Sequence, residues 1–302
     1  MGGILTRMAA RKYRRRGLRV VYTAHAFHFY QGASWKNWLL FYPIEWLCWW
    51  WTDVLITINK EDYACAKQHF HARKVEYLHG VGLDMTRVCD VGFDLAQRKR
   101  AELGISDEDI LFLSVGELSK RKNHQVVLDA LANLQLPNVK YLICGEGELR
   151  EYLTQQIERL HLKEQVQLLG YRRDVAELCQ AADLFVFPSR QEGLPVALME
   201  AIASRTPVIC SRIRGNTDLV VDANCMFEPT NSLQLLGCMK EKLGLDDDKS
   251  NADMKLRKQL ADNMADEVER NYQNLNLYDI NRVGLEMEMI YDFSVNQGIK
   301  SQ

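Results

Sequence analysis

Two glutamates eight residues apart, Glu192 and Glu200, are the side chains in this sequence best suited to chemistry. They lie in SRQEGLPVALMEAIAS, where Pro195 fits the first turn of a helix because its missing N–H would be unpaired there anyway. Glu192 is then expected in the loop before the helix, and Glu200 about one and a half turns inside it. Both carboxylates would face one pocket, where Glu200 can accept paired hydrogen bonds from a ribose diol and Glu192 from sugar hydroxyls.

The start of this helix also predicts an anion site. The free amides of Gly193, Leu194 and Val196 would face an anion at the positive end of the helix dipole, and glycine removes an obstructing side chain. A diphosphate suits this position. The plainer alternative is an acidic residue that favours the dipole beside a surface glutamate. The position directly after the apolar run LFVFPS, at the carboxyl end of a strand, favours the functional interpretation because open α/β sheets bind ligands there.

A second candidate for anion binding is the segment VGELSKRKNHQ. The strand ILFLSV ends at Gly116, and Lys120, Arg121 and Lys122 follow before the next helix. Three cations at the carboxyl end of a strand can neutralise a pyrophosphate, although such a run taken alone is as often a solvated surface.

Three further loops give weaker signals. GEGE, which starts at Gly145, and GYRRD, which contains Tyr171 and Arg172, each follow a strand and are expected to line the pocket. His25, in TAHAFHFYQG, also follows a strand; it could polarise a reacting hydroxyl or hold a sugar, or be an ordinary loop histidine. The histidines of KQHFHARK lack further ligands, so no metal site is predicted.

The elements that would position these residues alternate regularly along the chain. Short apolar runs such as RVVY, DVLITI, ILFLSV and VKYLIC are typical of buried parallel strands, and helical stretches separate them. The alternation predicts an α/β protein with two doubly wound parallel sheets. We expect an N-terminal domain over residues 1–93, a C-terminal domain over residues 94–275, and a final helical segment over residues 276–302.

Composition is consistent with this division. A chain of 302 residues usually needs two cores, and a net charge of -2 gives no general attraction to nucleic acid. The eight cysteines are scattered singly, and the basic N-terminus lacks the apolar core of a secretory signal, so a cytoplasmic protein is expected. The tryptophan-rich segment 35–58 contains charges and a proline, which argue against membrane spanning. Together with the basic cluster at residues 7–19 it suggests peripheral binding to an anionic membrane, although a core helix beside a solvated basic face is an equal alternative.

Taken in order, these motifs resemble family 4 glycosyltransferases of the GT-B fold, especially those of bacterial exopolysaccharide and capsule biosynthesis. The resemblance covers nearly the whole chain, and the paired glutamates are its most specific part. It implies a retaining enzyme that transfers a sugar from a nucleotide diphosphate, usually UDP-linked, to a lipid-linked or growing glycan. It also implies that no metal ion is bound, because the helix dipole and the basic loop supply the positive charge.

The resemblance assigns roles to single residues. Lys122 and Arg121 would contact the donor phosphates, Gly116 would let the backbone approach them, Glu200 would hold the ribose, and Glu192 would meet the transferred sugar. The loops that contain Gly145, Tyr171 and Arg172 would line the donor site, with Tyr171 and Arg172 near the base. His25 would lie near the reacting centre. The segment 276–302 resembles the family's terminal helix, which implies that it packs back on the first domain.

Two departures from the family pattern matter. Many members have arginine directly after the glycine that matches Gly116, whereas this chain has Glu117. Family members also begin with about two further strands, including a glycine-rich acceptor loop, so the N-terminal domain is expected to be incomplete. A catalytically inactive chain that still binds nucleotide is therefore one alternative function. A sugar-nucleotide epimerase or a phosphorylase on the same fold is another.

Overall fold

A computed structural model describes residues 2–70, 72–88, 93–245 and 256–299. The chain forms two compact units, and each has its own parallel sheet. Unit 1 comprises residues 1–83 and 277–302, and unit 2 comprises residues 84–276. The division falls after Leu83, about ten residues before the expected boundary at residue 94.

Unit 1 is built on three parallel strands in the order β1-β2-β3. Its elements are α1 (Gly2–Arg14), β1 (Val21–Ala24), α2 (Trp35–Cys48), η1 (Trp49–Trp51), β2 (Val54–Thr57), α3 (Lys60–His69), β3 (Lys74–Tyr77) and α12 (Ile280–Ile299), with the 3-10 turn η4 (Asn276–Tyr278) at the junction. The tryptophan-rich segment is thus divided among a helix, a 3-10 turn and a buried strand. None of the helices in the described ranges combines the length and the apolarity needed to cross a membrane.

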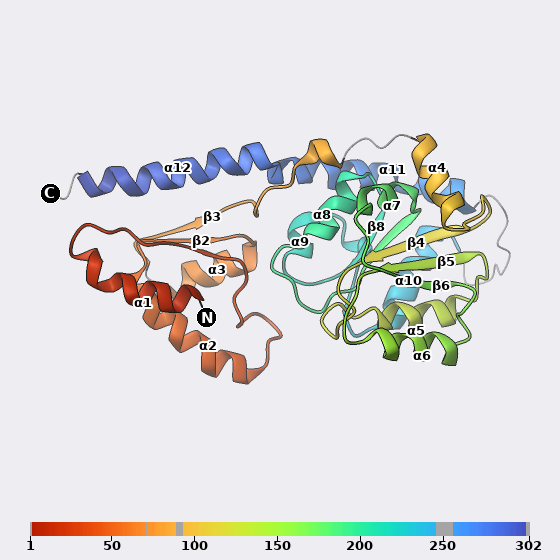
Figure 1. Cartoon of the computed structure of the whole chain (residues 1–302), viewed down its shortest axis with the longest axis horizontal. Coiled ribbons are helices and arrows are strands. Elements are labelled where there is room, and N and C mark those ends of the chain that lie inside the picture. Colours follow the sequence, from red (N-terminus) through yellow and green to blue (C-terminus); the bar gives the residue numbers. More distant parts are fainter. Residues whose placement is uncertain (1, 71, 89–92, 246–255, 300–302) are drawn as a thin grey trace. The chain divides into compact units, whose positions relative to one another are not determined.

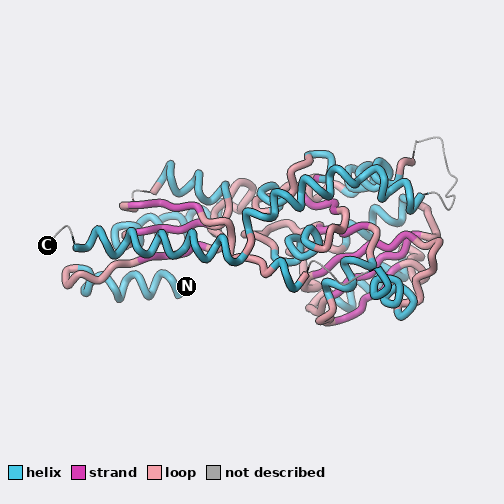
Figure 2. Tube along the Cα trace, turned by 90° about the horizontal axis from the view of Figure 1, so that it is seen from above, coloured by secondary structure: helices cyan, strands magenta, loops and turns pink. Residues whose placement is uncertain are grey.

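The last helix, α12, belongs to unit 1 although it ends the chain. Val283 and Ile290 of α12 join Val54, Ile56 and Leu78 of the sheet in one buried apolar cluster. The helix lies beside the three strands in both views (Figures 1 and 2). Apolar burial is the main force that holds it there.

Unit 2 is a six-stranded parallel sheet in the order β6-β5-β4-β7-β8-β9. Its strands are β4 (Ile110–Val115), β5 (Val139–Cys144), β6 (Val166–Gly170), β7 (Leu184–Phe187), β8 (Val208–Ser211) and β9 (Met226–Phe227). Its helices are α4 (Phe93–Glu102), α5 (Gln125–Leu134), α6 (Arg150–Arg159), α7 (Val175–Ala181), α8 (Val196–Ala203), α9 (Asn216–Leu219), α10 (Ser232–Leu243) and α11 (Leu256–Leu275), and its 3-10 turns are η2 (Met85–Arg87) and η3 (Ala223–Cys225).

The strand order of unit 2 creates the place where a ligand is expected. The chain moves outward from β4 to β6, returns to pair β7 with β4, and then continues in the other direction. Helices α5 and α6 lie on one face of the sheet, and α7 and α8 lie on the other (Figure 1). The loops after β4 and β7 therefore diverge at the switch point of the sheet, where doubly wound folds bind their ligands.

Candidate functional site

Glu192 lies in the loop between β7 and α8. All four residues of β7 are buried, which fixes the start of this loop. Pro195 is the residue directly before α8, with φ -84° and ψ 112°, so the helix begins one residue later than the sequence suggested. The side chain of Glu192 is only 9% exposed, and that of Glu200, inside the helix, is partly buried.

The amides at the start of α8 are available to a ligand. The N–H groups of Gly193, Leu194 and Val196 have no hydrogen-bond partner among the described residues. Such groups at a helix N-terminus attract anions.

The basic loop after β4 meets Glu192 directly. The Oε1 atom of Glu192 lies 3.0 Å from Arg121 Nη1 and 2.8 Å from Lys122 Nζ. The Lys122 ammonium also lies 4.9 Å from the centre of the Phe187 ring, at the end of β7. The structure thus brings one expected sugar-binding carboxylate together with the two expected phosphate-binding cations.

Glu200 differs from Glu192 in having no cation beside it. Its carboxylate has no hydrogen-bond or ion-pair partner among the described residues. Burial raises the pKa of Glu200 above its ordinary value, because the charged form loses hydration. A half-buried carboxylate with free lone pairs is suited to accept two hydrogen bonds from a diol.

Glycines allow the loops after β4 and β5 to touch. A Cβ atom on Gly145, where φ is +148°, would lie 1.9 Å from the carbonyl oxygen of Gly116. A Cβ on Gly116 would itself lie 3.1 Å from the Lys122 side chain. Larger residues at either position would displace the loop that carries the cations.

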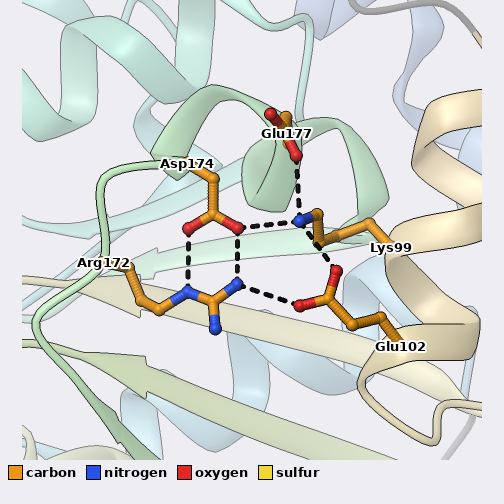
Figure 3. Close-up of polar contacts among 5 residues, drawn as sticks. All are labelled: Lys99, Glu102, Arg172, Asp174 and Glu177. Carbon is orange, nitrogen blue, oxygen red and sulfur yellow. Dashed lines mark hydrogen bonds and ion pairs between the residues drawn. The ribbon is translucent and has the colours of Figure 1, made fainter.

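The loop after β6 is fixed by a network of ions, drawn in Figure 3. Arg172 donates to Asp174 through Nε at 2.8 Å and reaches Glu102 at 3.4 Å. Lys99 of α4 lies within 2.9 Å of carboxylate oxygens of Glu102, Asp174 and Glu177. Its hydrogen bonds, above all the one to Asp174, raise the pKa of Lys99, and those from Arg172 lower the pKa of Asp174. The Arg172 guanidinium is therefore engaged within the protein, whereas Tyr171 is 69% exposed.

His25 belongs to unit 1, unlike the other candidate residues. It follows β1 in unit 1, and its side chain is exposed. The loop that carries it is held by Asp62, which accepts a hydrogen bond from the Phe27 N–H at 3.1 Å. The remaining candidate residues all belong to unit 2.

Two positions that support the site were missed in the sequence. Arg214 is 5% exposed and donates through Nε to the Glu192 carbonyl oxygen at 3.0 Å. Gly215, at φ +79°, approaches so closely that a Cβ there would lie 2.4 Å from the Gly193 carbonyl oxygen. The only signal in the sequence was an RGN turn after the strand PVICS.

Asn123 is a third such position. It adopts φ 58°, and its amide donates to the carbonyl oxygens of Pro188 at 3.1 Å and Pro229 at 2.8 Å. Asparagine tolerates this left-handed backbone better than most residues. It connects the basic loop to the loop before α8.

Within the described residues, one group could offer three metal ligands: Asp222, Cys225 and Glu267. Lys242 occupies its neighbourhood, because the ammonium bonds Glu267 and lies 3.4 Å from Cys225 Sγ. None of these residues belongs to the expected site. The ammonium already supplies the positive charge that these groups attract.

The fold agrees with comparisons to known proteins. The model of the family described as "Glycosyl transferases group 1" matches residues 96–260, more than half of the chain. The chain therefore belongs to this glycosyltransferase family, and its fold is GT-B, as the resemblance to family 4 predicted.

Among relatives, the putative glycosyltransferase EpsD of Bacillus subtilis is 37% identical over 75% of this chain and 60% of its own length. The Escherichia coli UDP-Gal:alpha-D-GlcNAc-diphosphoundecaprenol alpha-1,3-galactosyltransferase is 32% identical over 72% of this chain and 57% of its own. The solved structure of Anabaena HepE with UDP and glucose has a TM-score of 0.73 at 18% identity, covering 96% of this chain and 75% of that one. The chain thus spans about three fifths of the length of these two curated relatives.

Proposed function

We propose that this chain transfers a sugar from a UDP-sugar, with retention of configuration, to a lipid-linked or growing glycan of a bacterial surface polysaccharide. The observation that carries the proposal is the arrangement around the start of α8. Free amides, two cations and the Glu192 carboxylate lie at the carboxyl ends of β4 and β7, and Glu200 lies inside the helix that begins there. The E. coli relative is named for a UDP-galactose donor and a diphosphoundecaprenol acceptor, and HepE was solved with UDP, which supports these substrate classes.

In this proposal the diphosphate binds to the free amides of Gly193, Leu194 and Val196. Arg121 and Lys122 neutralise its charge, so no metal ion is needed. Glu200 accepts from the ribose hydroxyls and Glu192 from the transferred sugar.

The remaining candidate residues also have roles in this proposal. The exposed Tyr171 ring packs against the base, and the ion network around Arg172 holds that ring's loop in place. The close approach at Gly116 positions Lys122. His25 lies by the reacting hydroxyl.

The test is release of UDP by the purified chain from a panel of UDP-sugars, with polyprenyl-diphosphate glycans as acceptors. We expect release that depends on the acceptor and falls by at least about 100-fold in Glu192→Ala, since the lost contacts act in the transition state. The control is Glu164→Ala, an exposed carboxylate elsewhere in unit 2.

The other outcomes support the alternative functions. UDP binding without release would favour a chain that only binds nucleotide. Turnover of the donor without any acceptor, or with inorganic phosphate, would favour an epimerase or a phosphorylase.

We also propose that the chain works at an anionic membrane surface inside the cell. Helices α1 and α2 with η1 expose large apolar side chains, among them Leu5, Trp35, Leu39 and Trp50, at 67–69%. Exposed basic residues of α1, Arg11 and Lys12, accompany them. Tryptophan and lysine or arginine are the residues that favour lipid headgroups.

Sedimentation with lipid vesicles checks this proposal. Binding to phosphatidylglycerol vesicles should exceed binding to phosphatidylcholine and should drop in Trp35→Ala/Leu39→Ala. Equal binding to both lipids, or none, would argue against it.

A further inference from the structure

A cavity of unit 2 is lined in part by the loop that carries Arg121 and Lys122, but by other residues of that loop. It has a volume of about 440 Å³ and is lined by residues of the loop after β4, the first turns of α5 and α6, and the loop after β7. None of the residues proposed to bind the donor lines it. Helices α5 and α6 cover the face of the sheet opposite α8, which carries Glu200 (Figure 1).

The charge of this cavity is positive only. Lys120 and Arg190 are in its lining, and no aspartate or glutamate is. Neither cation has a carboxylate partner within 4.0 Å in the part of the chain that the structure describes. Arg121 and Lys122, on the same loop as Lys120, by contrast both form ion pairs with Glu192. Unpaired cations on a concave surface attract anions.

Neutral donors add to this preference. Both α5 and α6 begin at the cavity, and the residues that precede them, His124 and Leu149, make no side-chain capping hydrogen bond. The hydroxyl of Ser119, another lining residue, also has no hydrogen-bond partner among the residues that the structure describes. An anion with several oxygens would satisfy these groups together.

The remaining wall is apolar. It consists of Leu149, Leu153 and the ring of Tyr152, which is 37% exposed. An inorganic anion would leave this wall uncovered, whereas a ring on the ligand would pack against it.

We propose that this cavity binds a small phosphate monoester that carries a ring, at a site separate from the donor site. The phosphate lies between Lys120 and Arg190, and the ring lies against Tyr152. Arg190 also donates to Asn123 Oδ1 at 3.0 Å. A ligand bound to Arg190 is therefore connected through this side chain to Asn123, at the end of the basic loop. The proposal does not depend on the chain being a glycosyltransferase.

Calorimetric titration of the whole chain with phenyl phosphate and with inorganic phosphate tests this site. We expect phenyl phosphate to bind more tightly than inorganic phosphate. Lys120→Ala/Arg190→Ala should weaken it at least about tenfold, the effect of losing charge-assisted hydrogen bonds. Arg159→Ala/Lys163→Ala removes two charges from the other end of α6 and the turn after it, and should change nothing.

Two further variants separate this site from the donor site. Tyr152→Ala should weaken phenyl phosphate but leave inorganic phosphate unchanged, and Arg121→Ala/Lys122→Ala should leave both ligands bound. Thermal unfolding of each variant checks that it is folded. The proposal is overturned if phenyl phosphate does not bind, if it binds no better than inorganic phosphate, or if its binding is lost in Arg121→Ala/Lys122→Ala and kept in Lys120→Ala/Arg190→Ala.

Discussion

The two glutamates of the candidate site differ in whether a cation lies beside them. Glu192 is held by Arg121 and Lys122, so its negative charge is balanced with no ligand bound. Glu200 has no such balance, and its half-buried charge costs stability. The sequence predicted that the two glutamates would share a site, because their spacing around Pro195 depends on local helix geometry. It did not predict the different surroundings, because those depend on a loop 70 residues away.

The first prediction concerns the stability of Glu200→Gln. A raised pKa in the folded state means that the native protein loses stability as the pH rises from the unfolded pKa, near 4, through the folded one. The glutamine variant carries no charge and should not show this loss, so it should melt at a higher temperature than the native chain at pH 7.

Melting curves of both proteins between pH 4 and pH 8 measure the effect. The difference between them should shrink toward pH 4, and Glu164→Gln, which changes an exposed carboxylate, should behave like the native chain. A glutamine variant that melts lower at pH 7 would show that the Glu200 charge is stabilised instead.

At the scale of elements, the alternation of strands and helices was predictable from the sequence, whereas the ion pairs between elements were not. The buried strands of unit 2 appear as continuous apolar runs, and β4, β5, β7 and β8 lie where these runs predicted. The two-residue strand β9 falls outside these runs. Strands buried on both faces are recognisable in this way because no polar alternation interrupts them.

Helix α4 shows why the ion pairs were harder to predict than the strands. Its sequence is polar and contains no apolar run, yet Lys99 and Arg100 are buried in unit 2. Arg100 bonds Asp183 at 2.9 Å, and Lys99 bonds the loop before α7. Such pairs join residues about 80 positions apart, which no local pattern reveals.

The second prediction is that Lys99→Met destabilises unit 2 by about 2 kcal/mol at pH 7, since three carboxylates lose their shared donor. The effect should shrink in acid. Asp174 has a lowered pKa in the folded state, so its stabilising contribution is present above the unfolded pKa and is lost as the pH falls.

Urea unfolding at pH 7 and at about pH 2, below the unfolded pKa of an aspartate near 4, gives both values. Lys163→Met, which removes a surface lysine that is 63% exposed, is the matched control. Equal stability of Lys99→Met and the control would mean that the network of Figure 3 does not hold α4 in place.

At the scale of the whole chain, unit 1 is completed by residues from both ends of the sequence. The Tyr278 carbonyl accepts from the Leu83 N–H at 2.9 Å, and His79 Nδ1 lies 3.1 Å from Glu286. These residues are about 200 positions apart. The expectation that the last helix contacts the first domain came from the family resemblance, because its sequence alone indicates only an amphipathic helix.

The third prediction is that Ile290→Ala lowers the stability of unit 1 by about 2 kcal/mol, through loss of buried apolar contacts with β2. Met289→Ala, at a neighbouring position that is 65% exposed, should change it little. Thermal unfolding followed by tryptophan fluorescence reports on unit 1, where the six tryptophans lie. Indistinguishable curves for the two variants would remove α12 from the core of unit 1.

The central claim is that the carboxyl ends of β4 and β7 in unit 2 form a nucleotide-diphosphate site. Calorimetric titration of the whole chain with UDP tests it most directly. The account predicts one binding site, weakened at least about tenfold in Glu200→Ala and unchanged in Glu164→Ala, because two hydrogen bonds to a charged group are lost only in the first. No binding of UDP, or binding that Glu200→Ala leaves unchanged, would contradict the account.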